Sequence, residues 1–278
     1  MIHRKPRVLA TRLFPPAVEA RLASGFDAIL NPDDQVRDGA TVIRLAEGCD
    51  GVMCAAGDPL GAATIDALPA SVKIIATFSV GYEHVDVAAA TRRGIAVTNT
   101  PDVLTDATAD IALLCLLGAA RRAQEAEAVL RERRWTGWAP TQFVGTHLGG
   151  KRLGIFGMGR IGQATADRAR AFGMEIHYSN RSRLPAAQEK GATFHADAEA
   201  MLPLCHFLSI NAPMTPQTRK WLDARRIALL PDGAIVVNTA RGGVVDDDAL
   251  IAALKSGKLA AAGLDVFDGE PRIHDGYY

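Results

Sequence analysis

The sequence is poor in cysteine and has no excess of either charge, and each shortage excludes a class of protein. Its 278 residues include 4 cysteines and no CxxC pair, which argues against a disulfide scaffold, so we expect reduced thiols without a special role. Lysine plus arginine and aspartate plus glutamate both number 31, giving no argument for a nucleic-acid partner. Neither an HExxH motif nor clustered histidine and cysteine points to a metal site.

Long hydrophobic runs are also absent. The longest, residues 111–120, lies between Asp110 and Arg121 and is far shorter than the roughly 20 residues that span a bilayer. It predicts a buried helix that begins at Thr105 or Asp106 and ends at Arg121–Arg122. The basic N-terminus is not followed by the apolar segment of a secretory signal. We therefore expect a cytoplasmic protein without a membrane partner.

The sequence does contain 48% hydrophobic residues, in runs that alternate between strand-like and helical patterns. Strand-like runs cover residues 7–10, 28–30, 51–54, 73–78, 95–98, 152–156, 175–179, 207–211, 234–238 and 261–266, and helical runs cover 16–23, 41–48, 62–68 and 86–93. Such alternation predicts an α/β protein with parallel sheets. We expect two Rossmann-like or flavodoxin-like domains, residues 1–100 and 101–278, with a cleft between them and a helical stretch over 106–134 in the second.

The most informative motif follows the strand at 152–156 and reads Gly157-Met158-Gly159-Arg160-Ile161-Gly162. Gly157 permits a tight turn, Gly159 lets backbone N–H groups approach a pyrophosphate, and Gly162 lets the next helix pack close to the strand. The positive N-terminus of that helix would face the phosphates. The motif predicts a dinucleotide site, with Arg160 and Ile161 among the contacts.

The next strand, 175–179, ends in Asn180-Arg181-Ser182-Arg183. A site for NAD carries an acidic residue here to bind the ribose 2′-hydroxyl, and a carboxylate would repel a 2′-phosphate. At an effective dielectric of about 20, two unit charges about 4 Å apart interact by about 4 kcal/mol, enough to set a preference. The neutral and cationic residues therefore predict NADP(H) rather than NAD(H). The weaker alternative is that both arginines belong to a solvated loop.

Three other strand ends carry groups suited to a small acid. The turn Phe78–Tyr82 offers backbone N–H groups to an anion. Arg241 follows another strand and can hold a carboxylate by two parallel hydrogen bonds. Asp265 and Glu270 follow the last strand. Taken singly, these could be a tight turn, a surface arginine and an acidic loop.

Taken together and in order, the motifs resemble the D-2-hydroxyacid dehydrogenase family, and within it the glyoxylate and hydroxypyruvate reductases. The matching segments are Ser79 to Asp86, Thr108 to Ala112, Gly157 to Gly162, Asn211 to Thr215, Asn238 to Val245 and Gly263 to Pro271. The resemblance implies hydride transfer between a nicotinamide and C2 of a small 2-keto or 2-hydroxy acid. It also implies that residues 1–100 bind the substrate and 101–278 the dinucleotide.

The resemblance assigns roles to matching residues. Arg241 would hold the substrate carboxylate and polarise the keto oxygen, and the N–H groups of Val80 and Gly81 would bind the same carboxylate. Asp265 would contact the nicotinamide carboxamide. Further cofactor contacts would be Thr108, Pro213, Thr218, Thr239 and Ala240. Glu270 would raise the pKa of a partner histidine, which acts as the general acid.

That histidine is missing, because the expected Pro-His segment after Glu270 does not occur. His274 follows too closely, and we interpret it as a loop residue. The remaining histidines are expected to be structural, exposed or without a proton-donor role: His3, His84, His147, His177, His195 and His206. The family's C-terminal helix, which returns to the first domain, is missing as well. We therefore expect a truncated chain with an apolar surface exposed there, one that binds NADPH and turns over little 2-keto acid.

The segment Trp135 to Gln142 resembles the family's dimerisation region, so we expect a homodimer. Two alternatives for the function remain open. One is an NAD-linked dehydrogenase of the phosphoglycerate or D-lactate type. The other is a non-catalytic dinucleotide-sensing protein, since transcriptional corepressors also resemble this family.

Overall fold

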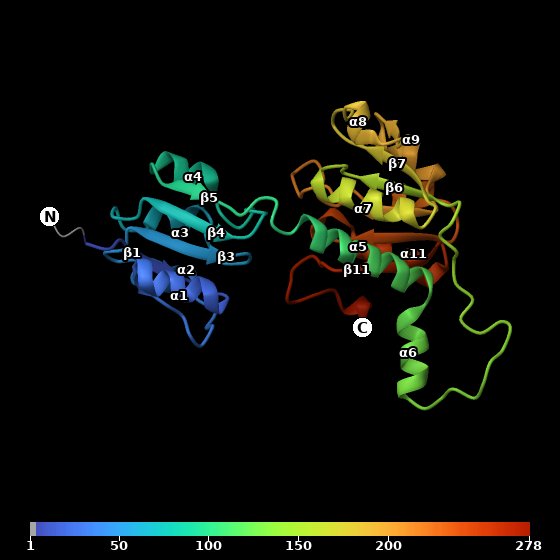
Figure 1. Cartoon of the computed structure of the whole chain (residues 1–278), viewed down its shortest axis with the longest axis horizontal. Coiled ribbons are helices and arrows are strands. Elements are labelled where there is room, and N and C mark those ends of the chain that lie inside the picture. Colours follow the sequence, from blue (N-terminus) through green and yellow to red (C-terminus); the bar gives the residue numbers. More distant parts are fainter. Residues whose placement is uncertain (1–3) are drawn as a thin grey trace. The chain divides into compact units, whose positions relative to one another are not determined.

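A computed structural model describes residues 4–278, which divide after Leu104 into two α/β units (Figure 1). Unit 1 ends at Leu104, and unit 2 is Thr105–Tyr278. The sequence predicted a division after residue 100. None of the helices in this described part is long and apolar enough to cross a membrane.

Unit 1 is a five-stranded parallel sheet in the order β2-β1-β3-β4-β5, the flavodoxin-like arrangement. Its strands are β1 Arg7–Ala10, β2 Asp27–Ile29, β3 Gly51–Ala55, β4 Ile74–Phe78 and β5 Ala96–Thr98, and its helices are α1 Pro16–Gly25, α2 Gly39–Leu45, α3 Ala62–Ala67 and α4 Val87–Arg92. Asp38 and Asp86 begin α2 and α4, because their side chains accept the N–H groups of Thr41 and Ala89.

Unit 2 is a six-stranded parallel sheet in the order β11-β10-β9-β6-β7-β8, the Rossmann arrangement. Its strands are β6 Arg152–Phe156, β7 Glu175–Ser179, β8 Thr193–His195, β9 Phe207–Ile210, β10 Ala234–Asn238 and β11 Leu259–Leu264. Its helices are α5 Thr105–Ala120, α6 Ala123–Arg131, α7 Arg160–Ala171, α8 Ala186–Glu189, α9 Ala198–Met201, α10 Ala224–Leu229 and α11 Asp247–Ser256, with short 3₁₀ turns η1 Leu202–Leu204, η2 Gly242–Val244 and η3 Asp275–Tyr277. Every residue of β9 and β10 is buried, which explains their continuous apolar sequences. The predicted fold class is confirmed.

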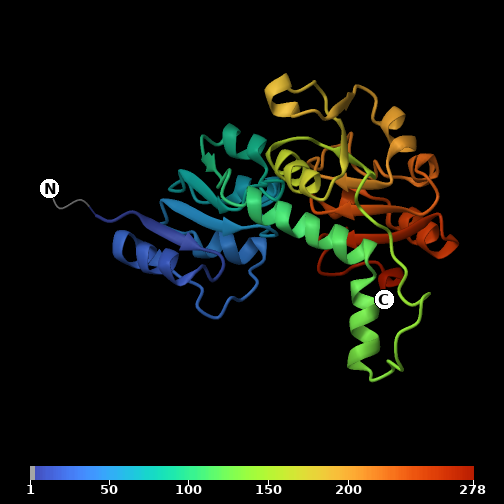
Figure 2. The ribbon, with the colours of Figure 1, turned by 45° about the vertical axis from the view of Figure 1, so that its right-hand side comes forward.

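The first helix ends near Arg121–Arg122, as the sequence predicted, and the rest of the predicted helical stretch 106–134 forms a second helix that ends at Arg131. Arg122 adopts a left-handed conformation with φ of 53°, which ends the first helix and starts α6 in a new direction. Helix α5 packs on α7 and on the sheet of unit 2, whereas α6 extends away from that sheet (Figures 1 and 2). The structure also adds strand β8 and places β11 two residues earlier than the predicted 261–266.

Candidate dinucleotide and substrate sites

The glycine loop after β6 has the two close approaches that the motif predicts. Gly157 has φ of 97°, and a Cβ there would overlap the backbone of Ala212. A Cβ at Gly162 would overlap the carbonyl oxygen of Gly157. Both glycines are therefore required by the protein itself, one for the turn and one for packing α7 against the loop.

Gly159 is different, because nothing in the described chain requires a glycine there. Its φ is −77°, and a Cβ would meet no atom within 4 Å. It occupies the N-cap position of α7, and no side chain of residues 4–278 caps that helix. Five other helices are capped by an aspartate, namely Asp38, Asp86, Asp197, Asp223 and Asp246. A helix N-terminus with no side-chain cap and no acidic residue in its first turn suits a phosphate group.

The predicted cofactor residues of unit 2 gather at one edge of its sheet. Strand β6 pairs with β7 on one side and with β9 on the other. The strand order therefore reverses beside β6, and this position is the switch point of a doubly wound sheet. The residues that follow the carboxyl ends of the strands are Asp265, Thr239 to Arg241, Asn211 to Pro213, Gly157 and Asn180, in the order of the strands. Ligands of open α/β sheets bind beyond such an edge.

Two buried polar atoms at this edge lack a partner within residues 4–278. They are Oγ1 of Thr239, a residue 7% exposed, and Oδ1 of Asn211. Buried polar atoms nearly always form a hydrogen bond, so each such atom needs an explanation. A dinucleotide carries hydroxyl, amide and phosphate groups that could supply these bonds. The edge therefore fits the cofactor that the glycine loop predicts.

Asn180 holds the glycine loop in place. Its Oδ1 accepts a hydrogen bond from the N–H of Met158 at 2.6 Å. Asn180 stands where an NAD site carries a carboxylate. No negatively charged residue therefore lies between the end of β7 and Arg181. Arg181, Ser182 and Arg183 are all exposed at this point.

Arg241 lies on a loop that is fixed by the side chain of Asn238. The Nδ2 group of Asn238 donates to the carbonyl of Arg241 at 2.9 Å, and its Oδ1 accepts from the N–H of Ala240 at 3.0 Å. The backbone N–H of Asp265 donates to the carbonyl of Asn238 at 3.0 Å, which ties the start of the final segment to the same loop. The Arg241 side chain is half-buried, with its Nη1 donating to the Ala240 carbonyl at 2.6 Å.

Glu270 has no histidine partner among the described residues. Its carboxylate accepts the backbone N–H of Phe267 and is exposed. His274 instead faces Asp248 in the first turn of α11, with Nε2 and Oδ1 3.1 Å apart, and its Nδ1 accepts from Gly276 N. The interpretation of His274 as a loop residue agrees with this geometry.

Two further predicted contacts lie in unit 2. Thr218 Oγ1 donates to the carbonyl of Pro213 at 2.7 Å and accepts from Thr215 N at 2.7 Å, which closes the loop after β9. Thr108 is half-buried in the first turns of α5.

The four cysteines are free, and burial raises the pKa of Cys54 and of Cys205 to about 12, so both remain thiols.

The turn after β4 in unit 1 is organised to present backbone N–H groups. The carbonyl of Ser79 accepts from Thr100 N at 3.0 Å, and the carbonyl of Val80 accepts from Asn99 Nδ2 at 2.8 Å. In a trans peptide the N–H points opposite to the carbonyl. The N–H groups of Val80 and Gly81 therefore both point away from these donors. Neither has an acceptor within residues 4–278, as an anion site requires.

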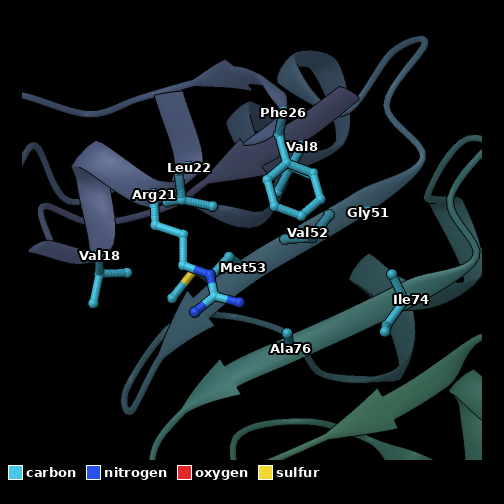
Figure 3. Close-up of a pocket in the computed structure, with 10 residues that line it drawn as sticks. All are labelled: Val8, Val18, Arg21, Leu22, Phe26, Gly51, Val52, Met53, Ile74 and Ala76. Carbon is cyan, nitrogen blue, oxygen red and sulfur yellow. The ribbon is translucent and has the colours of Figure 1, made fainter. Parts of the chain in front are cut away.

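Unit 1 also has an apolar hollow of about 320 Å³ between α1 and strands β1, β3 and β4 (Figure 3). Phe26, Leu22, Val52 and Ile74 line it, and Arg21 extends over it. Its lining lacks the polar groups that orient a small acid, so we do not assign the substrate to it.

Sequence comparison adds the decisive observation. Residues 113–277 match the family model described as "D-isomer specific 2-hydroxyacid dehydrogenase, NAD binding domain". The chain belongs to this family. It is therefore a 2-hydroxyacid dehydrogenase with a nicotinamide dinucleotide as its cofactor. No group of three or more histidine, cysteine, aspartate or glutamate residues in 4–278 could hold a metal ion.

Three individual relatives are named as dehydrogenases or reductases of small 2-hydroxy or 2-keto acids. The chain is 44% identical to a glycerate dehydrogenase of Hyphomicrobium methylovorum over 99% of this chain and 86% of the relative. It is 42% identical to a glyoxylate reductase of Thermococcus litoralis over 98% of this chain and 83% of the relative. A solved NADPH-dependent glyoxylate/hydroxypyruvate reductase of Sinorhizobium meliloti, in complex with NADP and malonate, superposes with a TM-score of 0.87 at 36% identity, covering 98% of this chain and 82% of that one.

Sequence reasoning did not find several residues that support the predicted sites. Asn99 and Asn238 hold the two loops that carry Val80 and Arg241. Tyr178 and Glu189 lie beneath the segment after β7. A tyrosine in the middle of a buried strand could have signalled such a network, because its hydroxyl needs a partner.

Proposed function

We propose that the chain binds NADP(H) in preference to NAD(H). The observation that carries this proposal is the segment after β7, where a neutral Asn180 and an exposed Arg181 stand in place of a carboxylate. The NADP complex of the Sinorhizobium relative supports it. A 2′-phosphate would be attracted to Arg181, whereas the ribose 2′-hydroxyl would find no acidic partner.

The proposed reaction is the reduction of small 2-keto acids such as glyoxylate and hydroxypyruvate to D-2-hydroxy acids. A bound nicotinamide would supply the hydride, and the proton of the new hydroxyl group would come from water, because Glu270 has no histidine partner within residues 4–278. By the roles that the resemblance assigns, the N–H groups of Val80 and Gly81 would bind the substrate carboxylate, and Arg241 would stabilise the negative charge that develops on the keto oxygen. The names of the glyoxylate reductase and glycerate dehydrogenase relatives support this substrate class.

Two measurements test these proposals separately. Fluorescence titration with NADPH and with NADH gives the two dissociation constants, and equal values would overturn the cofactor preference. The second measurement follows NADPH oxidation, and the change in NADPH affinity, with glyoxylate, hydroxypyruvate and pyruvate. The substrate proposal predicts that at least one of these keto acids causes NADPH oxidation or changes the affinity for NADPH, and that Arg241→Ala removes this effect. A chain that binds NADPH and responds to no keto acid would instead be a dinucleotide-sensing protein.

We also propose that the chain forms a homodimer through α6 and the segment 132–146. Helix α6 buries none of its residues within the described chain, and the two tryptophans that follow it, Trp135 and Trp138, are exposed. Exposed tryptophans next to an unpacked helix are typical of an interface.

A further inference from the structure

The two arginines after β7 have different surroundings. Arg183 forms a bidentate ion pair with Glu189, with Nε to Oε1 at 2.8 Å and Nη2 to Oε2 at 3.0 Å. Arg181 has no ion-pair or hydrogen-bond partner within residues 4–278. The same loop therefore carries one guanidinium that is engaged by the protein and one that is available to a ligand.

Glu189 is not an ordinary surface carboxylate. Its side chain is only 8% exposed, although that of Arg183 is 66% exposed. Oε1 also accepts a hydrogen bond from the hydroxyl of the fully buried Tyr178 at 2.6 Å. The bonds from Arg183 and Tyr178 lower the pKa of Glu189, so it is charged at neutral pH. Moving Arg183 away would leave this buried charge without its cation, which is strongly unfavourable.

The network also fixes the backbone of the loop. The Tyr178 hydroxyl accepts the N–H of Leu184 at 3.0 Å. On the other side, Asn180 is bonded to Met158 in the glycine loop. The segment is thus held at both ends, on the glycine loop before Arg181 and on β7 and α8 after Ser182. Only Arg181 and Ser182 lie between these two attachments, and both are exposed.

We infer that Arg183 is a positioning residue that acts through Glu189 and Tyr178 rather than a ligand of the cofactor, which leaves Arg181 and Ser182 as the residues of this loop that meet the 2′-phosphate of NADP(H). This inference rests on the proposed preference for NADP(H). It assigns different functions to two arginines that the sequence placed together. Glu189 becomes a determinant of cofactor affinity without touching the cofactor.

Titrations with NADPH and NADH test the inference, using this chain and the variants Arg181→Ala, Arg183→Ala, Arg183→Lys and Glu189→Gln. Arg181→Ala should weaken NADPH binding at least about tenfold and change NADH binding less than about twofold, because it removes a charge-assisted contact to the phosphate. Arg183→Ala and Glu189→Gln should each weaken NADPH by a smaller, similar factor. The double variant should be no worse than either, and Arg183→Lys should restore much of the affinity.

The opposite assignment gives a different result. If Arg183 were a phosphate ligand restrained by Glu189, Glu189→Gln would tighten NADPH binding while Arg183→Ala weakened it as much as Arg181→Ala, and the inference would be overturned. The salt dependence gives a second criterion, since Arg181→Ala should reduce the slope of log Kd against log salt and Arg183→Ala should not. A steep slope loss in Arg183→Ala also overturns it. Equal NADPH and NADH affinities in the unmodified chain would instead refute the proposed cofactor preference.

Discussion

At the residue scale, single asparagine side chains set the direction of peptide groups in each predicted binding loop. Asn180 bonds to Met158 in the glycine loop, Asn99 to Val80 in the turn after β4, and Asn238 to Ala240 and Arg241. A primary amide can both donate and accept, so it can hold a turn that has no strand partner. These amides lie at strand ends, where the ladder hydrogen bonds stop.

Asn99→Ala should weaken binding of a small dicarboxylate or keto acid without affecting NADPH. The Val80 carbonyl would lose its donor, and the peptide that presents the Gly81 N–H could then rotate. The loss of one hydrogen bond of about 1 kcal/mol corresponds to an affinity about fivefold lower. Calorimetry with malonate in the presence of NADPH measures this change. Thr100→Ala is the matched control, because Thr100 donates through its backbone N–H. Equal affinity of the Asn99 and Thr100 variants would contradict the argument.

The pair His177 and His195 should make the protein less stable in mild acid. Their Nδ1 and Nε2 atoms are 2.9 Å apart, so one ring must accept. Burial lowers the pKa of both histidines, and the charges of His195 and Arg152 lower that of His177 further, while Glu175 opposes this. The unfolded chain therefore binds more protons than the folded chain once the pH falls below about 6.5. The free energy of unfolding should decrease as the pH falls from about 7 to about 5.

Urea unfolding at several pH values checks this prediction. His177→Gln should flatten the pH dependence, although some should remain because burial also lowers the pKa of His206. Parallel curves for the parent chain and His177→Gln would rule out the pair as the cause.

At the element scale, the start of α7 separates folding from binding. Gly159→Ala places a methyl group in open space at an ordinary φ and costs only the difference between glycine and alanine at an N-cap, so the free energy of unfolding should fall by no more than about 1 kcal/mol. NADPH should nevertheless bind about tenfold or more weakly, because the backbone could no longer approach the pyrophosphate. Gly162→Ala should instead destabilise the protein by about 1 to 3 kcal/mol through overlap with the Gly157 carbonyl. Thermal melts and NADPH titrations measure both effects, and equal loss of stability in the two variants would contradict this division.

The elements show how far the sequence predicts the structure. The predicted bounds of β6, β7 and β10 agree with the structure, because apolar runs between polar ends leave little choice of register. Strand β8 has three residues and no clear periodicity, so it was not predicted. The end of the first helix at Arg121–Arg122 was predicted, whereas the left-handed backbone of Arg122 was not, because arginine does not favour that conformation as glycine does.

The sequence predicts some parts of the candidate site in more detail than others. The glycines after β6 have a fixed spacing that follows from the turn itself, so the sequence alone suffices to predict this loop as a dinucleotide site. The ion pair of Arg183 with Glu189 depends on where α8 packs against β7. Spacing along the chain does not determine that packing, and Arg181 and Arg183 therefore looked equivalent.

At the scale of the whole molecule, the proposed homodimer depends on apolar side chains that the described chain leaves exposed. Leu130 in α6 is 65% exposed and Trp138 is 90% exposed, with its ring packed edge-on against Trp135 at 5.4 Å. We expect sedimentation at about 10 µM to show a dimer, and Leu130→Asp combined with Trp138→Ala to yield a monomer, since tryptophan anchors carry much of the interface energy and an unpaired carboxylate is costly to bury. Val36→Asp replaces an equally exposed apolar residue of unit 1 and should leave the dimer intact. The monomeric variant should still bind NADPH, because the glycine loop after β6 lies outside the exchanged residues. A parent chain that sediments only as a monomer would contradict the proposed dimer.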